Sequence, residues 1–223
     1  MIRSRRNGPA TLPGRSALIS LGAAVVLAVS GAVAAFAPQA ASAATTSAGS
    51  YVPVHAARVV DTRSGRGGHH GALRAHRTMA TRIGGHAHVP ARGVAAVAVT
   101  LTVLSPTGSG SLVAWARGTR RPATVNVGFT RNSAAADLAV VPVSRTGWID
   151  LYNDSRGTVQ VVADVTGYYT AGSAGQPGSY RPVRASRVVD TRTGRLANGK
   201  GRLHAGRSIS PRIAGHAGVP TSA

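Results

Sequence analysis

The carboxylates are the first side chains to consider for chemistry, because the chain has only six acidic residues. They are Asp61, Asp137, Asp150, Asp154, Asp164 and Asp190. A glycoside hydrolase needs two carboxylates that face each other at a defined separation. Asp154 lies within Asn153–Gly157, whose residue types are typical of a turn. The sequence favours structural roles for these aspartates and predicts no catalytic residue. A small secreted hydrolase that uses Asp150 or Asp164 is the alternative.

Histidines are the next candidates, because imidazole binds zinc and copper. Five of them lie close together in the sequence: His69, His70, His76, His86 and His88. This part of the chain has the least regular pattern, and it has no cysteine or carboxylate at ligand spacing. No serine lies in a Gly-x-Ser-x-Gly context, and no Gly-rich phosphate loop precedes a helix. The sequence therefore predicts solvated loop histidines, no metal site and no cofactor.

The pattern Arg58-x-x-Asp61-x-Arg63 places two guanidinium groups next to one carboxylate. One interpretation is an Arg-Asp clasp at the end of a strand, in which charge-assisted hydrogen bonds fasten a loop and Asp164 bonds a neighbouring segment. The other interpretation assigns Arg58 and Arg63 to opposite strand faces, so that Arg58 is structural and Arg63 faces a ligand. The structural interpretation is favoured, and it predicts that loss of Asp61 lowers stability before it lowers binding.

A duplication explains why this pattern occurs twice. Residues 50–66 and 179–195 are identical at 13 of 17 positions, at a constant offset of 129. Residues 213–220 also match 83–90, with one residue inserted, whereas nothing matches residues 94–170. The predicted organisation is a complete repeat over 50–170, a flexible Gly/Ser-rich linker over 171–178 and an incomplete second repeat over 179–223. That second repeat has few large apolar residues, so we expect it to be disordered or docked on another unit, as in a truncated reading frame.

The elements of the complete repeat are short apolar strands separated by turns. Extended pieces are expected at 51–54 and 58–62, and stronger strands at 94–104, 111–116, 124–129, 136–143, 148–152 and 159–169. Residues 82–85 are interpreted as a connector. In residues 148–152 the alternation puts Ile149 and Leu151 on the core face, and Val161, Ala163 and Val165 form a second core face. The pattern predicts an all-β protein built as an antiparallel β-sandwich, either Ig-like or jelly-roll-like.

The N-terminal residues have the three parts of a secretory signal. Arg3, Arg5, Arg6 and Arg15 precede an apolar helical run over 17–35, and Ala41-Ser42-Ala43 is a small-residue cleavage site. The sequence predicts a signal peptide over 1–43 and a leader over 44–49, with no membrane span after cleavage. An uncleaved anchor is the alternative. The expected location is extracellular or at the cell surface.

Charge is the strongest compositional signal. The chain has 26 basic and 6 acidic residues and a net charge of +20. Four arginines lie in residues 1–43, so 22 basic residues remain against six acidic ones, a net charge of +16. Such a charge favours adhesion to an anionic cell-wall polymer or glycan. The arginines are scattered and aromatic residues are few, so no specific nucleic-acid site is predicted. The chain has no cysteine.

Several short motifs together resemble a family of secreted β-rich repeats from actinomycetes and related high-GC bacteria. The motifs are Tyr51-x-Pro53, Arg58-Val59-Val60-Asp61-Thr62-Arg63, Val89-Pro90, Asn126-Val127, Leu151-Tyr152-Asn153 and Val161-Val162-Ala163-Asp164-Val165. The resemblance covers nearly all of residues 50–170 and implies a non-catalytic repeat that occurs alone, in tandem or beside secreted hydrolase domains. The expected function is a secreted module that associates with the cell envelope, an extracellular glycan or another polyanion. A truncated accessory fragment of a longer secreted enzyme is the second alternative.

Overall fold

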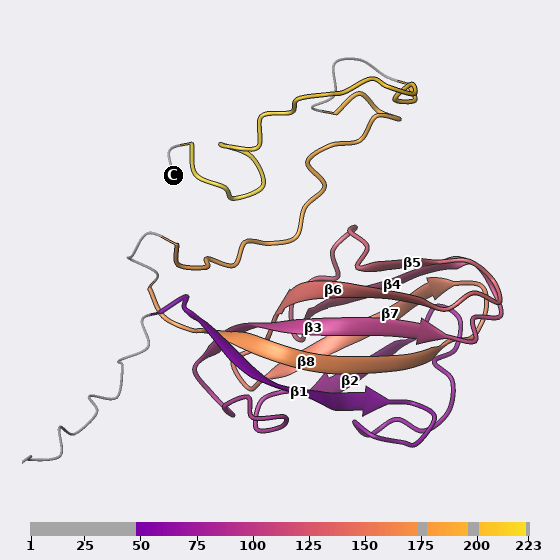
Figure 1. The fold of residues 1–223 in the computed structure, drawn as a ribbon, viewed down its shortest axis with the longest axis vertical. Coiled ribbons are helices and arrows are strands. Elements are labelled where there is room, and N and C mark those ends of the chain that lie inside the picture. Colours follow the sequence, from indigo (N-terminus) through magenta and orange to yellow (C-terminus); the bar gives the residue numbers. More distant parts are fainter. Residues whose placement is uncertain (1–47, 174–177, 196–200, 222–223) are drawn as a thin grey trace, which may run out of the picture. The chain divides into compact units, whose positions relative to one another are not determined.

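The computed structural model describes residues 48–173, 178–195 and 201–221. The predicted signal peptide lies outside these residues. The described residues form eight strands and no helix (Figure 1). The strands are β1 (Tyr51–Asp61), β2 (Thr78–Arg82), β3 (Val94–Leu104), β4 (Gly110–Ala116), β5 (Val127–Phe129), β6 (Ala135–Pro142), β7 (Trp148–Ser155) and β8 (Gln160–Thr170). No helix within these ranges is long and apolar enough to cross a membrane.

The strands form two four-stranded sheets that pack face to face (Figure 1). One sheet has the order β1-β8-β3-β6 and the other has the order β2-β7-β4-β5. The antiparallel pairs are nested: β4 pairs with β5, β3 with β6, β2 with β7 and β1 with β8. A long hairpin rolled into two sheets has this order, which is the jelly-roll arrangement. The predicted antiparallel β-sandwich is confirmed, and of its two variants the jelly roll is the one observed.

The core lies between the sheets and is aliphatic. Ile149 and Leu151 of β7 are fully buried, as are Val161, Ala163 and Val165 of β8. The predicted core faces of both strands are therefore confirmed. Each large aliphatic side chain that is withdrawn from water contributes about 1.5 to 3 kcal/mol, and this burial stabilises a fold that has no disulfide.

Local patterns missed or misplaced three elements. The two extended pieces at 51–54 and 58–62 are one strand, β1, interrupted by register shifts after Pro53 and Arg58. The sequence does not predict β2, because its five residues include two threonines and one arginine and carry a weak apolar signal. The strand forms by pairing with β7. The prediction of a turn at Asp154 is wrong, because Asp154 pairs with Ser111 inside the sheet.

The second repeat keeps the local turns of the first without its strands (Figure 1). The backbone bridge between Asp190 and Arg195 is of the same kind as the bridge between Asp61 and Arg66. No strand occurs within residues 178–195 and 201–221. Val189 is half-buried there, whereas its equivalent in the first copy, Val60, is fully buried. Whether this segment is disordered or docks elsewhere stays a prediction.

Candidate functional site

The predicted clasp residues lie together at the end of β1. Arg58 Nε and Nη2 donate to the two carboxylate oxygens of Asp164 at 3.0 and 3.3 Å, and Arg58 Nη1 donates to Asp61 Oδ2 at 3.2 Å. Arg63 Nε and Nη2 donate to the two oxygens of Asp61 at 2.9 and 2.8 Å. The side chain of Asp61 is 8% exposed, whereas those of Arg58 and Arg63 are 44% and 50% exposed. The clasp is thus a nearly buried carboxylate held by two half-exposed guanidinium groups.

The same bonds set the charge state of Asp61. Hydrogen bonds from the Arg63 side chain, together with its backbone N–H, hold the pKa of Asp61 well below its usual range, and burial opposes this effect. Arg58 and Arg63 in turn have raised pKa values, chiefly because they donate to Asp164 and Asp61 respectively. The carboxylate therefore stays ionised to a lower pH than an ordinary aspartate.

The proposed division of Arg58 and Arg63 between opposite faces is wrong. Both guanidinium groups contact the one carboxylate of Asp61. A register shift between Arg58 and Val60 breaks the two-residue alternation on which the parity argument rested. Arg63 also lies beyond the end of β1, where the chain turns back.

We expect Asp61→Asn, made in an Asp190→Asn background so that neither copy keeps its clasp carboxylate, to lower the free energy of unfolding by about 1 to 2 kcal/mol. It removes the charge from one bidentate contact with Arg63 and one single hydrogen bond from Arg58, both half-exposed guanidinium groups. Because folding depresses the pKa of Asp61, its contribution is complete above about pH 4 and is lost as the pH falls further. Urea unfolding measured from pH 6 to pH 2 should therefore show a free energy of unfolding that depends less on pH in the variant than in the unsubstituted protein. Asp190→Asn alone is the matched control and should leave the unfolding of the sandwich unchanged. Equal losses for both variants would contradict a role for the clasp in the sandwich.

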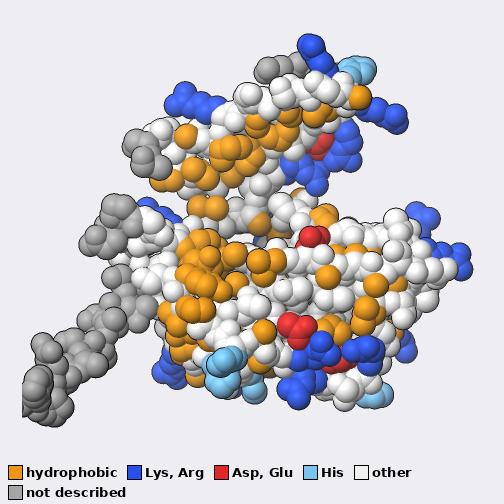
Figure 2. All heavy atoms as spheres, in the orientation of Figure 1, with side chains coloured by type: hydrophobic (Ala, Val, Ile, Leu, Met, Phe, Trp, Pro, Cys, Tyr) orange, Lys and Arg blue, Asp and Glu red, His pale blue; other side chains and the backbone are white. Residues whose placement is uncertain are grey.

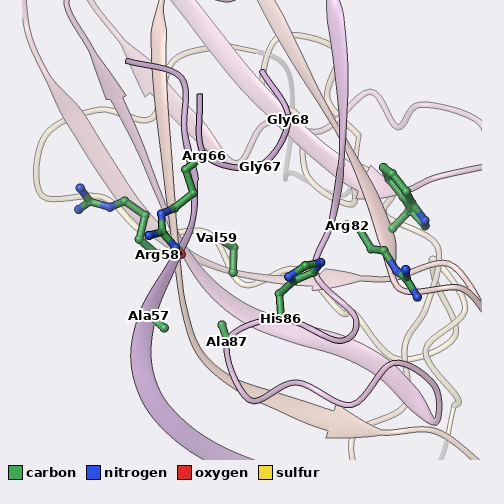
Figure 3. A pocket seen from close by; sticks show the side chains of 10 residues that line it. Ala57, Arg58, Val59, Arg66, Gly67, Gly68, Arg82, His86 and Ala87 are labelled. Carbon is green, nitrogen blue, oxygen red and sulfur yellow. Dashed lines mark hydrogen bonds between the residues drawn. The ribbon is translucent and has the colours of Figure 1, made fainter. Parts of the chain in front are cut away.

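A basic pocket of about 440 Å³ lies beside the clasp, where the edges formed by β1 and β2 approach each other. Its polar and aromatic lining consists of Arg58, Arg66, Arg82, His86 and Trp148. Figure 3 shows Arg58 and Arg66 close together at one end, with His86 and Arg82 farther along. Among the described residues that line the pocket, none is acidic. At the lower edge of the sandwich in Figure 2, where β1 lies in Figure 1, acidic and basic side chains lie side by side.

Five separate segments supply this pocket, one of which is the loop after β2 that carries His86. Arg58 comes from β1, Arg66 from the loop after it, Arg82 from the end of β2 and Trp148 from the first position of β7. Arg66 is held in place because its Nη1 donates to the carbonyl oxygen of Arg58 at 3.2 Å. Residue 67 must be glycine, because its φ is +85° and a Cβ would lie 2.7 Å from the carbonyl oxygen of Val59. Sequence reasoning missed the pocket, because its arginines look scattered until the strands pair.

The two aspartates considered for hydrolysis lie on opposite sides of the sandwich. Asp164 is on the outer face of β8, since Ala163 and Val165 face the core. Asp150 is on the outer face of β7, since its neighbours Ile149 and Leu151 face the core. Sheets that pack face to face are about 10 Å apart, so these carboxylates do not form a dyad. Partial burial raises the pKa of Asp150, and the charge of Arg117 opposes the shift.

The histidine-rich segment does not gather ligands. Within residues 48–173, 178–195 and 201–221, no three His, Cys, Asp or Glu side chains are arranged to hold a metal ion. His76 is not part of the pocket lining, and its Nδ1 lies 3.3 Å from the hydroxyl of Tyr152. His86 contributes to the basic pocket instead.

The fold and the pocket define a jelly-roll sandwich with a basic edge. No family model matches the chain, and neither a curated protein nor a solved structure does. The function is therefore argued from the pocket and from the sequence alone.

Proposed function

We propose that this protein is a secreted, non-catalytic β-sandwich module that binds an anionic polymer of the cell envelope or an extracellular glycan. The observation that carries the proposal is the pocket lined by Arg58, Arg66, Arg82 and His86 with no acidic residue among its lining. Guanidinium groups donate two parallel hydrogen bonds to phosphate or carboxylate groups, so a cluster of them favours a polymer that carries such groups.

Two features make Arg66 and Arg82 the best ligand contacts. Arg58 already donates to Asp61 and Asp164. The Arg66 side chain donates one hydrogen bond, to a backbone oxygen, and among the described residues the Arg82 side chain has no hydrogen-bond or ion-pair partner. Trp148 adds an aromatic ring beside Arg82, because the two residues are directly opposite each other in the β2–β7 pair. The Arg117 guanidinium lies over the Trp148 ring, 5.0 Å from its centre. The opposite face of the indole is therefore the flat apolar surface offered to a sugar ring, while the arginines neutralise the charged substituents of the sugar.

The excess positive charge of the chain supports the same partner. The net charge of +16 that remains without residues 1–43 attracts a polyanion at long range, and salt screens this attraction. A pocket adds short-range bonds that depend on particular side chains. The two contributions are separable, because diffuse attraction falls with any lost charge and pocket binding falls only with charges in the pocket.

We expect Arg66→Gln combined with Arg82→Gln to weaken binding to purified cell walls about tenfold to a hundredfold, since each charge-assisted bond contributes about 1.5 kcal/mol or less when partly exposed. The matched control is Arg131→Gln combined with Arg156→Gln, which removes the same charge from two exposed sites outside the pocket. Trp148 is the first residue of β7, and Arg156 follows the last. Retention is measured against salt, on walls with and without their anionic polymers. Equal losses in the two variants would show that binding is diffuse, and no retention at low salt would overturn the proposal.

A further inference from the structure

One position in the sandwich has two candidate occupants in this chain. β1 lies at the edge of its sheet and pairs only with β8. The second-copy segment, residues 179–195, repeats residues 50–66 and forms no strand in the structure. We infer that residues 179–192 can replace residues 50–63 on the edge of β8, so that the sandwich is closed by either copy. This inference does not rest on the proposed ligand.

The second copy retains every side chain that joins β1 and the residue after it to β8. Those side chains are Tyr51, Arg58, Val60 and Thr62, which contact Thr166, Asp164, the core and Val161 respectively. Their equivalents are Tyr180, Arg187, Val189 and Thr191, with no change of residue type. The contacts that hold β1 in place are therefore available to the second copy without alteration.

The residues that differ between the two copies are not part of the buried core. The four positions that differ are Val52, His55, Ala57 and Ser64, and none of them is buried. A change at an exposed or half-exposed strand position alters stability by only a few tenths of a kcal/mol. The second copy thus loses no core contact when it takes the β1 position.

The Arg-Asp clasp is already formed in the second copy. Arg192 Nη2 and Arg187 Nη1 lie 2.8 and 3.2 Å from Asp190 Oδ2. The equivalent distances in the first copy are also 2.8 and 3.2 Å. The turn that follows the strand is therefore organised before any pairing, which lowers the entropy that the segment loses when it binds.

The short connection between β8 and the second copy favours replacement of β1 by the second copy of the same chain over that of another molecule. Tyr51 pairs with Tyr169 near the end of β8, so an antiparallel replacement must begin at that point. Nine residues separate Thr170 from Tyr180, and the Tyr180 N–H already donates to the Gly49 carbonyl at 2.8 Å. The rings of Tyr169 and Tyr180 are 4.3 Å apart. So short a connection gives an effective concentration in the millimolar range or above.

The exchange also rebuilds the basic pocket. Arg58 and Arg66 of the first copy line it, and their equivalents Arg187 and Arg195 are again arginines. Each arrangement leaves one copy outside the sheet with its valines half-exposed, so the number of paired strands is equal in both. The chain thus contains two segments, residues 50–63 and 179–192, that can each form the edge strand beside β8.

Disulfide trapping in the full chain tests the exchange, because the chain has no cysteine that could interfere. Arg58 and Asp164 are directly opposite in the β1–β8 pair, where Cα atoms are about 4.5 to 5.5 Å apart, within reach of a disulfide. Arg187→Cys combined with Asp164→Cys should form a disulfide within one chain under mild oxidation. Arg58→Cys with Asp164→Cys is the positive control. His216→Cys with Asp164→Cys is the control for random encounters between the two regions. Its disulfide should form at least tenfold more slowly than that of Arg187→Cys with Asp164→Cys.

The products decide the outcome. An intrachain disulfide, identified by peptide mass and a monomeric mobility without reductant, supports the inference. A disulfide-linked dimer would overturn the choice of the chain's own copy, because the second-copy segment would then enter a neighbouring molecule. Reaction no faster than that of the His216 control would overturn the exchange itself.

Thermal unfolding gives an independent test. Val60→Asp places a charge in the core, and exchange would limit the damage by bringing in Val189. We expect Val60→Asp to lower the Tm by less than half as much as Val60→Asp combined with Val189→Asp, while Val189→Asp alone leaves the Tm nearly unchanged. Equal losses for Val60→Asp and the double variant would contradict the inference.

Discussion

Replacing Asn153 with aspartate should destabilise the sandwich by about 3 to 5 kcal/mol, although the two side chains have nearly the same shape. Asn153 is fully buried in β7. Its Nδ2 donates to the carbonyl oxygens of Leu73, Arg74 and Gly157 at 3.1, 3.1 and 2.8 Å. A carboxylate has no hydrogen to donate, so each of the three carbonyl oxygens would lose one of its two donors and would face a negative charge.

The pH dependence separates this mechanism from a simple packing defect. Burial and the facing carbonyl groups would raise the pKa of an aspartate at this position in the folded state. Protonation restores one donor, so the deficit relative to the unsubstituted protein should shrink as the pH falls from 7 towards 4. Urea unfolding of both proteins at several pH values measures this difference in the free energy of unfolding. The matched control is Asp154→Asn, one residue further along β7 with a side chain 54% exposed, which should change stability by about 0.5 kcal/mol or less. A deficit that does not change with pH would contradict the donor argument.

Gly157→Ala should destabilise the sandwich by about 3 kcal/mol, because two turns cross at this residue without room for a Cβ. An added Cβ would lie 2.6 Å from Thr107 Oγ1 and 2.7 Å from the Thr107 carbonyl carbon. Neither turn can move aside easily. Thr158 N donates to Thr107 Oγ1 at 2.8 Å, and Thr107 N donates to the Thr158 carbonyl at 3.0 Å.

Gly128→Ala is the matched control for this substitution. Gly128 lies in β5, and an added Cβ would meet no atom within 4 Å. Neither glycine has a positive φ, so the two substitutions differ in contact and not in backbone strain. We expect a change of about 0.5 kcal/mol or less for Gly128→Ala in equilibrium urea unfolding. Similar losses at the two positions would contradict the crossing of the turns as the cause, because only at Gly157 would a Cβ meet neighbouring atoms.

Both predictions concern residues that a reader of the sequence would place in loops. Asn153 and Gly157 lie in a polar stretch with turn-forming composition. Their importance comes from neighbours far away along the chain: Thr107 lies 50 residues before Gly157, and Leu73 lies 80 residues before Asn153. The local sequence predicts the turn, but it does not predict which distant segments the turn residues contact.

The basic pocket has the same origin. Arg66 and Arg82 are separated by a loop and by a strand that carries no clear apolar pattern, and Trp148 lies 66 residues beyond Arg82. The jelly-roll order puts the end of β2 against the start of β7, and this pairing brings the arginine and the tryptophan together. Among the four residues predicted for the clasp, only Arg58 also lines the pocket.

The sequence by itself determined the strands with strong alternation, their core faces, the duplication and the contacts that form within a few residues. The clearest example is the Arg-Asp clasp, because Asp190 makes the same bonds in a segment without strands as Asp61 makes at the end of β1. Those bonds join residues two and three positions apart, so no other segment is needed. Only the tertiary structure decided that Arg58 also binds Asp164, 106 residues away, and that Val60 is buried while Val189 is not. Such contacts depend on which strands pair, and pairing is set by burial of whole sheet faces and not by local preference.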